Sequence, residues 1–426
     1  MQKKYYWIGQ RMIDGVIYSQ SIPGLSVIFC CDSCFLPEKI EKKFEIYSLE
    51  RKSQKKLNWS SFHIDLLFQQ FSKEISFYES KGYIILPYDI PSFLLHIKKR
   101  DFIINWRVIS YNIPRAIQRM ILLKSDIKVP KWLSIDSQYR WEDMSTTLGS
   151  HIIIQYDNTS SGHGTFLIKS KEQFEFLKNN VGNNPAIASS FIPDSIPISS
   201  HLLIDNNFIQ DTIISFKIIE TIKKDGIISL IYYGNDFGIY NYLNSKQKEN
   251  IKKTLNLLGQ ILFKTGIRGL LGIDMLVTSN NDVYVIEINF RLQNSTPLST
   301  QIETNLGMKP LILKLINSKN TQKYSKKNIK KTQMGAQYIL RSKENKKTIR
   351  SGIYDTNGNL LHNIRNFDIT TLSDKQYMVV SESWKNTTFI AKGAPLAKIY
   401  SFEPILTITG NRTKKFSYFL EKLGWP

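Results

Sequence analysis

The sequence predicts an α/β protein that is α+β in part. Two observations support this prediction: short strand-like runs alternate with helical patterns up to about residue 125, and hairpin patterns prevail farther along the chain. Strand–helix alternation is typical of a parallel sheet covered by helices. We therefore expect a Rossmann-like α/β domain over residues 1–113, a central region over 114–320 and a small β-rich C-terminal lobe over 333–426.

Four short runs rich in β-branched and aromatic residues are the expected strands of the first domain: Tyr5–Ile8, Ser26–Cys30, Phe44–Ser48 and Tyr83–Leu86. Apolar residues recur at helical spacing from Ser60 to Glu79, and Pro91 starts a further helix after the fourth strand. No G-x-G-x-x-G motif follows any of these strands, so a dinucleotide-binding site is not expected.

The central region and the C-terminal lobe are expected to combine helices with hairpins. The helical patterns are Pro114–Lys124, 140–148, Lys171–Asn179, Lys246–Thr265 and, in the lobe, Phe416–Leu423. The expected central strands are His151–Gln155, Thr165–Lys169, Ala186–Ile192, His201–Ile204, Phe208–Ile213, Ile273–Thr278 and Val283–Asn289. Those of the lobe are Tyr338–Leu340, Gly352–Tyr354, Met378–Ser381 and Leu396–Tyr400. The Asn- and Asp-containing segments 205–207 and 279–282 predict tight turns.

Composition limits the class of protein. Hydrophobic residues make up 42% of the 426, enough for buried cores, so a wholly disordered chain is excluded. The most apolar stretch, Leu257–Val277, is interrupted by Lys264, Arg268 and Asp274, so no membrane-spanning helix is expected. The three cysteines and the absence of a signal-peptide pattern indicate a cytoplasmic protein without a membrane partner.

The chain is strongly basic. It carries 57 Lys and Arg residues against 36 Asp and Glu residues, a formal net charge of +21. A basic chain attracts nucleic acid, anionic lipid, an acidic carrier protein or nucleotide phosphates. The charges are dispersed apart from the run Lys323–Lys331, which favours ordinary solvated lysines over a nucleic-acid-binding surface.

The pattern most indicative of chemistry is a pair of acidic strands. Asp274 lies in the apolar strand GIDMLV, and Glu287 and Asn289 lie two residues apart in the next one, followed by Arg291. Residues two apart share one face of a strand, and Asp274 can reach that face across the hairpin. Two carboxylates and an amide oxygen suit Mg²⁺, which commonly binds substrate phosphates as well. Alternation by itself leaves one alternative open, a surface hairpin with Glu287 pointing outward and Asn289 as a cap.

A second pattern is the loop Asn158–Thr165, rich in Ser and Gly. Small residues let backbone N–H groups close around phosphate oxygens, and hydroxyl groups add further donors. The loop joins two expected strands, so it is not a Walker loop. A merely flexible turn is the alternative.

In this order, the Gly-rich hairpin, the long helix and the acidic hairpin resemble the ATP-grasp superfamily of carboxylate–amine and carboxylate–thiol ligases. The resemblance covers roughly Pro114–Gln301. The segments HIIIQYDNTSSGHGTF, YYGNDFG, GIDMLV and EINFRLQNST are most similar to the pheganomycin-type peptide and amino-acid ligases. The resemblance implies an ATP-grasp fold with a lid subdomain at about 135–192 and a metal-binding core at about 193–320.

The resemblance also implies roles for individual residues. Asp274, Glu287 and Asn289 would hold Mg²⁺, or alternatively Mn²⁺, against the phosphates of ATP. The lid residues Ser160, Ser161, Gly162, Gly164 and Thr165, together with Arg115, would contact these phosphates. The hinge residues Ser189, Ser190, Phe191 and Ile192 would pair with adenine. Arg291 would bind the reacting carboxylate, with Ser295, Thr296 and Asn235 lining the same pocket.

Two positions depart from the superfamily pattern. The strand before the lid usually supplies a phosphate-binding Lys, whereas this chain has Gln155, which can donate a hydrogen bond but has no charge. No clear match exists for the acidic residue that usually holds the ribose, and Asp194 is the nearest candidate.

The implied function is an ATP-dependent carbon–nitrogen ligase that forms an amide bond through an acyl phosphate. The implied substrates are a small-molecule or peptide carboxylate and an amine. An acidic carrier protein and a second copy of the chain are further candidate partners. Two alternatives stay open. One is a non-catalytic nucleic-acid-binding protein, and the other is a degenerate ATP-grasp scaffold, which is suggested by Gln155 in place of the usual lysine. His163 in the lid is a candidate base, though a spectator role is favoured.

Other candidates for chemistry are weaker. Cys30, Cys31 and Cys34 are close in sequence, but no fourth Cys or nearby His completes a tetrahedral metal site. His63 and His96 lie in amphipathic patterns and are expected to be structural.

Overall fold

A computed structural model of the 426-residue chain provides the structure. It describes residues 3–57, 64–88, 113–123, 125–136, 138–157, 159, 162, 164–181, 185–205, 209–316, 332–344, 346–383, 389–390 and 392–425. Several predictions concern residues outside these ranges: the helix at Pro91, His63, His96, Ser160, Ser161, His163 and the basic run Lys323–Lys331.

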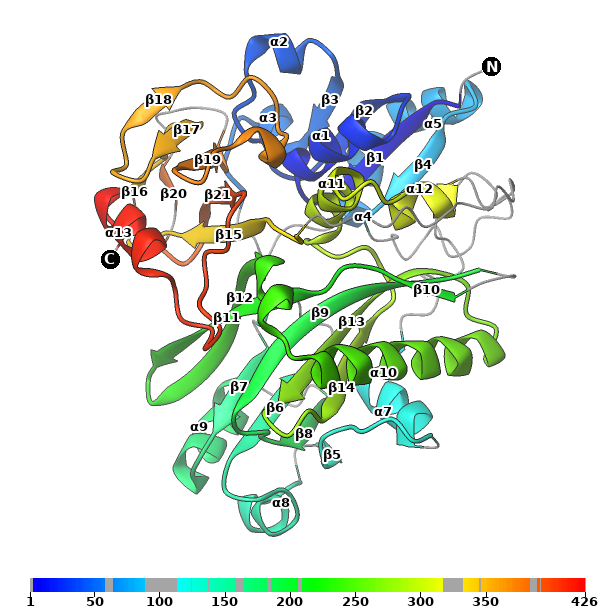
Figure 1. Cartoon of the computed structure of the whole chain (residues 1–426), viewed down its shortest axis with the longest axis vertical. Helices are drawn as coiled ribbons and strands as arrows, with labels where there is room; N and C mark the ends of the chain where they lie inside the picture. Colours follow the sequence, from blue (N-terminus) through cyan, green and yellow to red (C-terminus); the bar gives the residue numbers. More distant parts are fainter. Residues whose placement is uncertain are drawn as a thin grey trace.

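The N-terminal region, residues 3–88, contains a parallel sheet, as predicted (Figure 1). Its strands are β1 (Tyr5–Gly9), β2 (Leu25–Cys30), β3 (Glu45–Ser48) and β4 (Ile84–Pro87). Their order is β3-β2-β1-β4, and each neighbouring pair is parallel. The helices are α1 (Met12–Ser21), α2 (Glu38–Glu41), α3 (Leu49–Ser53), α4 (Ile64–Gln70) and α5 (Ser72–Ser80). The expected helix from Ser60 is thus divided, because Phe71 leaves helical geometry at φ −123° and ψ 27°.

The N-terminus of α1 is already occupied by an acidic side chain. The backbone N–H of Met12 donates a hydrogen bond to Asp32 Oδ1 at 2.7 Å. In dinucleotide-binding folds, a phosphate takes this place at the helix N-terminus. The Asp32 carboxylate therefore takes the place that such a phosphate would need.

The central region and the C-terminal lobe share one long sheet. Its path within the described residues is β14-β13-β9-β11-β12-β15-β21-β19-β17-β18. The strands are β9 (Ser195–Ile204), β10 (Ile209–Asp211), β11 (Ser215–Lys224), β12 (Ile227–Asp236), β13 (Gly269–Thr278), β14 (Val283–Asn289), β15 (Ala336–Arg341), β17 (Gly352–Asp355), β18 (Leu360–His362), β19 (Gln376–Ser381) and β21 (Pro395–Ser401). β12 pairs with β15 at Gly234–Asp236, so the lobe continues the central sheet.

A smaller group of strands lies mostly in the range predicted for the lid, and we call these strands the lid strands. It consists of β5 (Trp132–Ile135), β6 (Ile152–Tyr156), β7 (Thr165–Ile168) and β8 (Ala186–Ser190), with α8 (Trp141–Leu148) and α9 (Lys171–Val181). The hairpin β6–β7 and the strand β8 confirm the predicted order. β7 pairs with β12 at Ile228 and Ser229, which connects the lid to the main sheet.

The hairpin β11–β12 is the largest element that the sequence prediction missed. Its turn is Asp225-Gly226, and both residues have positive φ, 50° and 80°. Such a pair is a strong hairpin signal, because both central positions of a type I′ turn need positive φ. Gly234, Asn235 and Asp236, from the segment YYGNDFG, are the last residues of β12.

Helix α10 (Ser245–Lys264) lies along β9, β13 and β14 on one face of the sheet (Figure 1). Its residues Ile251, Leu255, Leu258 and Leu262 are fully buried and share a core with Ile273. The helix begins with a capping box in which Asn244 and Gln247 bond to each other's backbone N–H groups. Core packing therefore fixes which face of β13 and β14 remains for a site.

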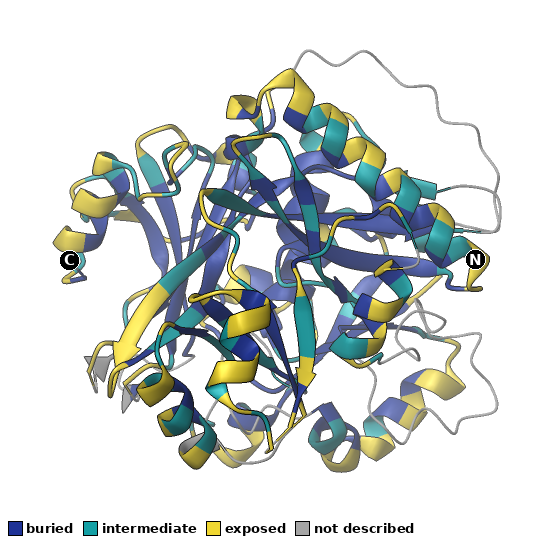
Figure 2. Cartoon of the chain, turned by 90° about the horizontal axis from the view of Figure 1, so that it is seen from below, coloured by how far each residue is buried: buried dark blue, intermediate teal, exposed yellow. Residues whose placement is uncertain are grey.

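The remaining described elements are α7 (Arg115–Leu123), η3 (Gly238–Tyr242), α11 (Thr296–Asn305), α12 (Leu311–Ile316), β16 (Lys346–Lys347), η4 (Ile369–Thr371), β20 (Phe389–Ile390) and α13 (Lys414–Lys422). Figure 2 shows buried residues gathered along the central strands and exposed residues on the outer faces of the helices. Among the described residues, no helix combines the length and the apolar character needed to cross a bilayer.

Candidate active site

A cavity of about 400 Å³ lies between the lid strands and the face of β13 and β14 opposite α10. Lid, central sheet and N-terminal region all contribute to its lining. Of the predicted site residues, the cavity is lined by Arg115, Gln155, Gly162, Thr165, Ser189, Ser190, Phe191, Ile192, Asp194, Asn235, Asp274, Glu287, Asn289, Arg291 and Ser295. The structure thus brings together residues that the sequence separates by up to 180 positions.

Asp274 and Glu287 lie directly opposite each other on β13 and β14. The neighbouring pair Ile273 and Ile288 is buried in the core beneath α10, so the two acidic side chains face the cavity. Asn289 is on the same face and donates from Nδ2 to Asp274 Oδ2 at 3.1 Å. The alternative of an outward-facing surface hairpin is therefore wrong for this structure.

Asp274 is almost fully buried, and a cation balances its negative charge. The Lys217 ammonium group on β11 lies 2.6 Å from Asp274 Oδ2, and Gln293 Nε2 donates to Oδ1 at 3.3 Å. Burial raises the pKa of Asp274, but Lys217, Ser199 and Gln293 outweigh burial, so this pKa lies below its usual value. Asp274 is consequently a carboxylate at neutral pH and a competent oxygen ligand.

Gly272 makes room for this arrangement. A Cβ at this position would lie 2.1 Å from Cδ of Gln293, the residue that donates to Asp274. With any larger residue at position 272, the flexible Gln293 side chain would have to shift, and its amide would move away from the Asp274 carboxylate.

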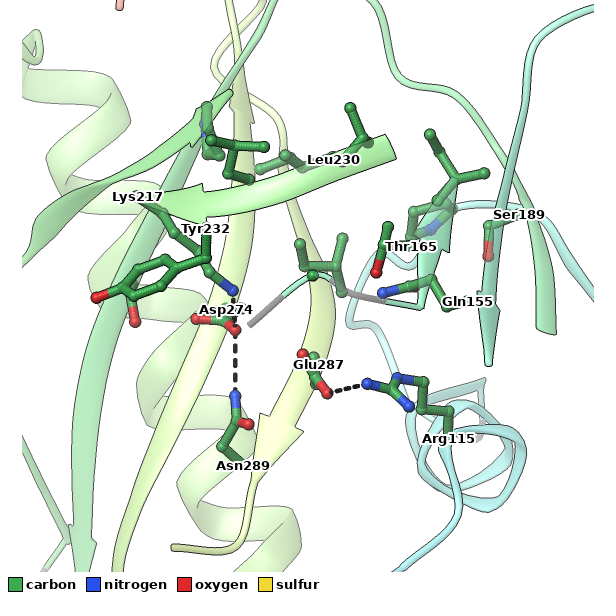
Figure 3. Close-up of a pocket in the computed structure, with 18 of the residues that line it drawn as sticks. Arg115, Gln155, Thr165, Ser189, Lys217, Leu230, Tyr232, Asp274, Glu287 and Asn289 are labelled. Atoms are coloured by element: carbon green, nitrogen blue, oxygen red, sulfur yellow. Dashed lines mark hydrogen bonds and ion pairs between the residues drawn. The ribbon is translucent and has the colours of Figure 1, made fainter. Parts of the chain in front are cut away.

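The negative charge of Glu287 is balanced by an arginine from the other side of the cavity. Arg115, the first residue of α7, places Nη2 2.8 Å from Glu287 Oε1 and donates from Nη1 to the carbonyl oxygen of Tyr156 at 2.8 Å. Arg119, one turn later, is 2% exposed and donates to the carbonyl oxygen of Val285. Burial lowers the pKa of Arg119 to about 10, although Glu287 opposes the shift, so the guanidinium stays charged at neutral pH. Figure 3 shows the two carboxylates between Lys217 and Arg115.

Gln155, Thr165 and Ser189 stand on neighbouring lid strands at the edge of the cavity (Figure 3). Gln155 is paired with Thr165 across the hairpin. In the loop, Gly162 has a φ of 82°, and a Cβ there would lie 2.1 Å from the carbonyl oxygen of Leu230. Only glycine fits this close approach of the loop to β12. Gly164 does not line the cavity; its carbonyl accepts from the N–H of Tyr156 at 3.0 Å.

The predicted hinge consists of Ser189 and Ser190, the last two residues of β8, and of Phe191 and Ile192, which follow the strand. The N–H groups of Ser190 and Phe191 already donate to the carbonyl oxygens of Lys131 and His151, at 2.9 and 3.0 Å. These two N–H groups are therefore already bonded within the chain and are not available for the predicted contact with adenine. Asp194, with a φ of 49°, lines the cavity next to the hinge.

Arg291, which also lines the cavity, contacts the N-terminal region. Its Nη1 donates to the phenol oxygen of Tyr88 at 2.6 Å. Tyr232 donates to Asn235 Oδ1, and the amide of Asn235 donates to Ser215 Oγ at 2.9 Å. Thr296 does not line the cavity, contrary to the prediction, because its Oγ1 bonds to Nε2 of the buried His201 at 2.9 Å.

The lining residues that sequence analysis missed include Tyr88, Arg119, Lys217 and Tyr232. Lys217 had a usable signal, because it is a single lysine among apolar residues in the run SFKII, at the start of the strand that ends at the overlooked Asp225-Gly226 turn. Tyr88 had none, because its place in the cavity depends on how the N-terminal region docks.

Part of this chain is similar to proteins of known family. Residues 120–304 match the family model described as ATP-grasp domain. The chain contains an ATP-grasp domain. A ligase of Niallia circulans named [Butirosin acyl-carrier protein]--L-glutamate ligase is 24% identical over 228 residues, covering 50% of this chain and 52% of the relative. The carbamoyl phosphate synthase large chain of Sulfurisphaera tokodaii is 23% identical over 192 residues, covering 43% of this chain and 17% of the relative. This chain thus spans about half or less of the length of these two relatives.

Solved structures share the fold over nearly the whole chain. The N5-carboxyaminoimidazole synthetase of Staphylococcus aureus, complexed with ADP, has a TM-score of 0.57 at 14% identity and covers 94% of both chains. Biotin carboxylase of Campylobacter jejuni has a TM-score of 0.59 at 12% identity, with 94% of this chain and 87% of that one covered. The ATP-grasp domain of this chain therefore has the predicted fold, with an N-terminal α/β region and a β-rich C-terminal lobe around it. The predicted domain boundaries stay a prediction.

Proposed function

We propose that this chain is an ATP- and Mg²⁺-dependent ligase, forming ADP and an amide bond through an acyl phosphate. One observation carries the proposal: Asp274 and Glu287 face each other in the cavity between Lys217 and Arg115. A buried and a partly buried carboxylate that each have a cationic partner form a site built to hold and balance charge.

The donor set fits a hard divalent cation. Asp274, Glu287 and Asn289 offer two carboxylates and an amide oxygen on one face of the hairpin, the ligands that Mg²⁺ accepts. These residues would hold Mg²⁺, or Mn²⁺ in its place. The bound ion would supply neutralisation of the phosphate charges of ATP.

The cavity residues would carry out two steps. In the first, Arg291 holds the acid substrate, and a carboxylate oxygen of that acid attacks the γ-phosphorus of ATP. The bond between the γ-phosphorus and the ADP oxygen breaks. Lys217 and Arg115 stabilise the charge that spreads over the transferring group. In the second, the amine nitrogen attacks the acyl carbon, the bond to phosphate oxygen breaks, and the nitrogen loses a proton to the departing phosphate or to water. The lid excludes water from the acyl phosphate in between.

The substrates are proposed as an amino acid, a peptide or a related carboxylic acid with an amine, in specialised metabolism. The relative whose name states an acyl-carrier protein and L-glutamate supports this class. A carrier protein is a possible partner because carriers with acidic surfaces would be attracted by a net charge of +21. Moderate salt should then abolish turnover of carrier-bound acid while sparing the same acid in free form. Light scattering would test a homodimer.

The decisive variant is Glu287→Gln, which keeps the shape of the side chain and removes its charge. We expect ADP release to fall about 100-fold, since a metal ligand and the partner of Arg115 are lost together. ADP would be measured with a panel of acids and amines, and hydroxylamine would trap the acyl phosphate as a hydroxamate.

Glu249→Gln, on the exposed side of α10, is the matched control and should turn over normally. Unchanged turnover of a folded Glu287→Gln would contradict the metal assignment. Nucleotide binding without ADP release for any acid would favour the degenerate scaffold instead.

A further inference from the structure

Arg291 is contacted by the N-terminal region, far from it in sequence. Tyr88 directly follows β4, is 8% exposed and lines the cavity. Its phenol oxygen accepts the hydrogen bond from Arg291 Nη1 at 2.6 Å, and the Arg291 guanidinium carbon lies 5.1 Å from the centre of the Tyr88 ring. One side chain thus offers Arg291 both an oxygen acceptor and an aromatic surface.

Tyr88 is itself held by the rigid part of the N-terminal region. Its N–H donates to the carbonyl oxygen of Ile8 at 2.8 Å, which continues the pairing of β4 with β1. Its ring lies edge-on to Trp7, with centroids 6.4 Å apart and an interplanar angle of 72°. The phenol oxygen is therefore fixed relative to the parallel sheet and presents a defined position to Arg291.

From this geometry we infer that Tyr88 is a positioning residue for Arg291. The inference rests on the proposed function, in which Arg291 binds the carboxylate of the acid. An arginine side chain has many rotamers, and an acceptor on Nη1 removes much of that freedom before the acid arrives. Tyr88 also fixes Nη1 in place together with the Leu292 carbonyl oxygen, which accepts from the same nitrogen at 3.2 Å. Tyr88 lies outside the matched residues 120–304, so the family comparison does not assign it.

The consequence is that substrate recognition is shared between two parts of the chain. The N-terminal region sets the orientation of the cation, and the ATP-grasp domain supplies the cation itself. Affinity for the acid then depends on Tyr88, whereas affinity for ATP, held near the lid, does not.

The first test replaces Tyr88 with Phe, which removes the hydroxyl group and keeps the ring. We expect the KM for the acid to rise roughly 10-fold to 100-fold, the range for losing one hydrogen bond to a charged group. The KM for ATP should change by less than about twofold, since Tyr88 is expected to act on the acid only. Tyr83→Phe is the matched control: Tyr83 directly precedes β4, as Tyr88 follows it, and it packs against Tyr78 away from Arg291.

The second test is a double-mutant cycle with Arg291→Met. If Tyr88 acts through Arg291, Tyr88→Phe has little further effect on the KM for the acid once Arg291 is gone. Equal effects of Tyr88→Phe in both backgrounds, or equal rises in the KM for the acid and for ATP, would overturn the positioning role. Normal turnover by Arg291→Met would instead overturn the role of Arg291 in the proposed function. Absence of acid-dependent ADP release from the unaltered chain would overturn both.

Discussion

Asp274 shows how the charge of one buried residue depends on its neighbours. Its side chain is 1% exposed, and Lys217, 20% exposed, is its ion-pair partner. The pKa of Asp274 in the folded chain lies below the value of about 3.9 expected in the unfolded chain. This carboxylate therefore adds stability above about pH 4, and that addition is lost as the pH falls through the folded pKa.

Replacing Lys217 with Met should destabilise the fold. The change leaves a buried carboxylate without its cation, which typically costs about 3 kcal/mol in the free energy of unfolding. Urea unfolding at pH 7 measures the effect. Lys223→Met, at an exposed position of the same strand β11, should change the free energy by no more than about 0.5 kcal/mol. Similar losses for both variants would contradict the assigned charge balance.

At the level of elements, Glu303 joins two helices that the sequence did not predict. It lies on α11, is 2% exposed, and accepts at Oε2 from the N–H of Leu311, the first residue of α12, at 3.1 Å. Burial raises the pKa of Glu303 to about 8, although the Leu311 N–H and Lys314 oppose the shift. The native state therefore retains a proton that the unfolded chain, with a pKa of about 4.3, has lost at neutral pH.

The sign of this linkage predicts a fall in stability with rising pH. Between the unfolded pKa of about 4.3 and the folded pKa of about 8, the native state binds more protons, so its stability decreases as the pH rises. Glu303→Gln, which cannot ionise, should lack this decrease and become relatively more stable toward pH 8. Thermal unfolding at pH 5, 6, 7 and 8 measures the slope. The control Glu249→Gln should keep the slope of the unaltered chain, and parallel curves for all three would contradict the assignment.

At the level of the whole molecule, buried ion pairs connect the N-terminal region to the C-terminal lobe. Arg11 and Glu382 form an ion pair with side chains 1% and 2% exposed. Nearby, Lys398 of β21 lies 2.7 Å from Asp14 of α1. Charges buried this deeply make the relative placement of the two parts specific, since any other placement would leave them uncompensated.

Removing one partner of the Arg11–Glu382 pair should destabilise the molecule more than removing both. Glu382→Leu leaves Arg11 buried without its carboxylate and should lower the free energy of unfolding by about 3–5 kcal/mol. The double variant Arg11→Met/Glu382→Leu should recover much of this loss. Urea unfolding of the two variants measures the difference, and the exposed pair Lys42–Glu38, 75% and 81% exposed, is the control with little effect. A double variant less stable than Glu382→Leu would argue against the pair as an electrostatic unit.

The sequence by itself determined the local elements and the acidic core of the site. Alternation and turn residues predicted the parallel strands of the N-terminal region, the lid hairpin and the hairpin that carries Asp274 and Glu287. These features depend on side-chain period and on turn residues close in the chain, so they can be recognised from the sequence.

Only the tertiary structure decided which side chains meet the carboxylates. Lys217 of β11 and Arg115 of α7 meet the two carboxylates, and Tyr88, which follows β4, meets Arg291. Each reaches the cavity through packing between strands and helices distant in sequence. Packing also removed Thr296 from the cavity, by turning its hydroxyl group toward His201. Local patterns specify which face of a strand a residue occupies, but its partners across a cavity depend on how whole layers dock, because buried charges and apolar surfaces are satisfied jointly by the complete fold.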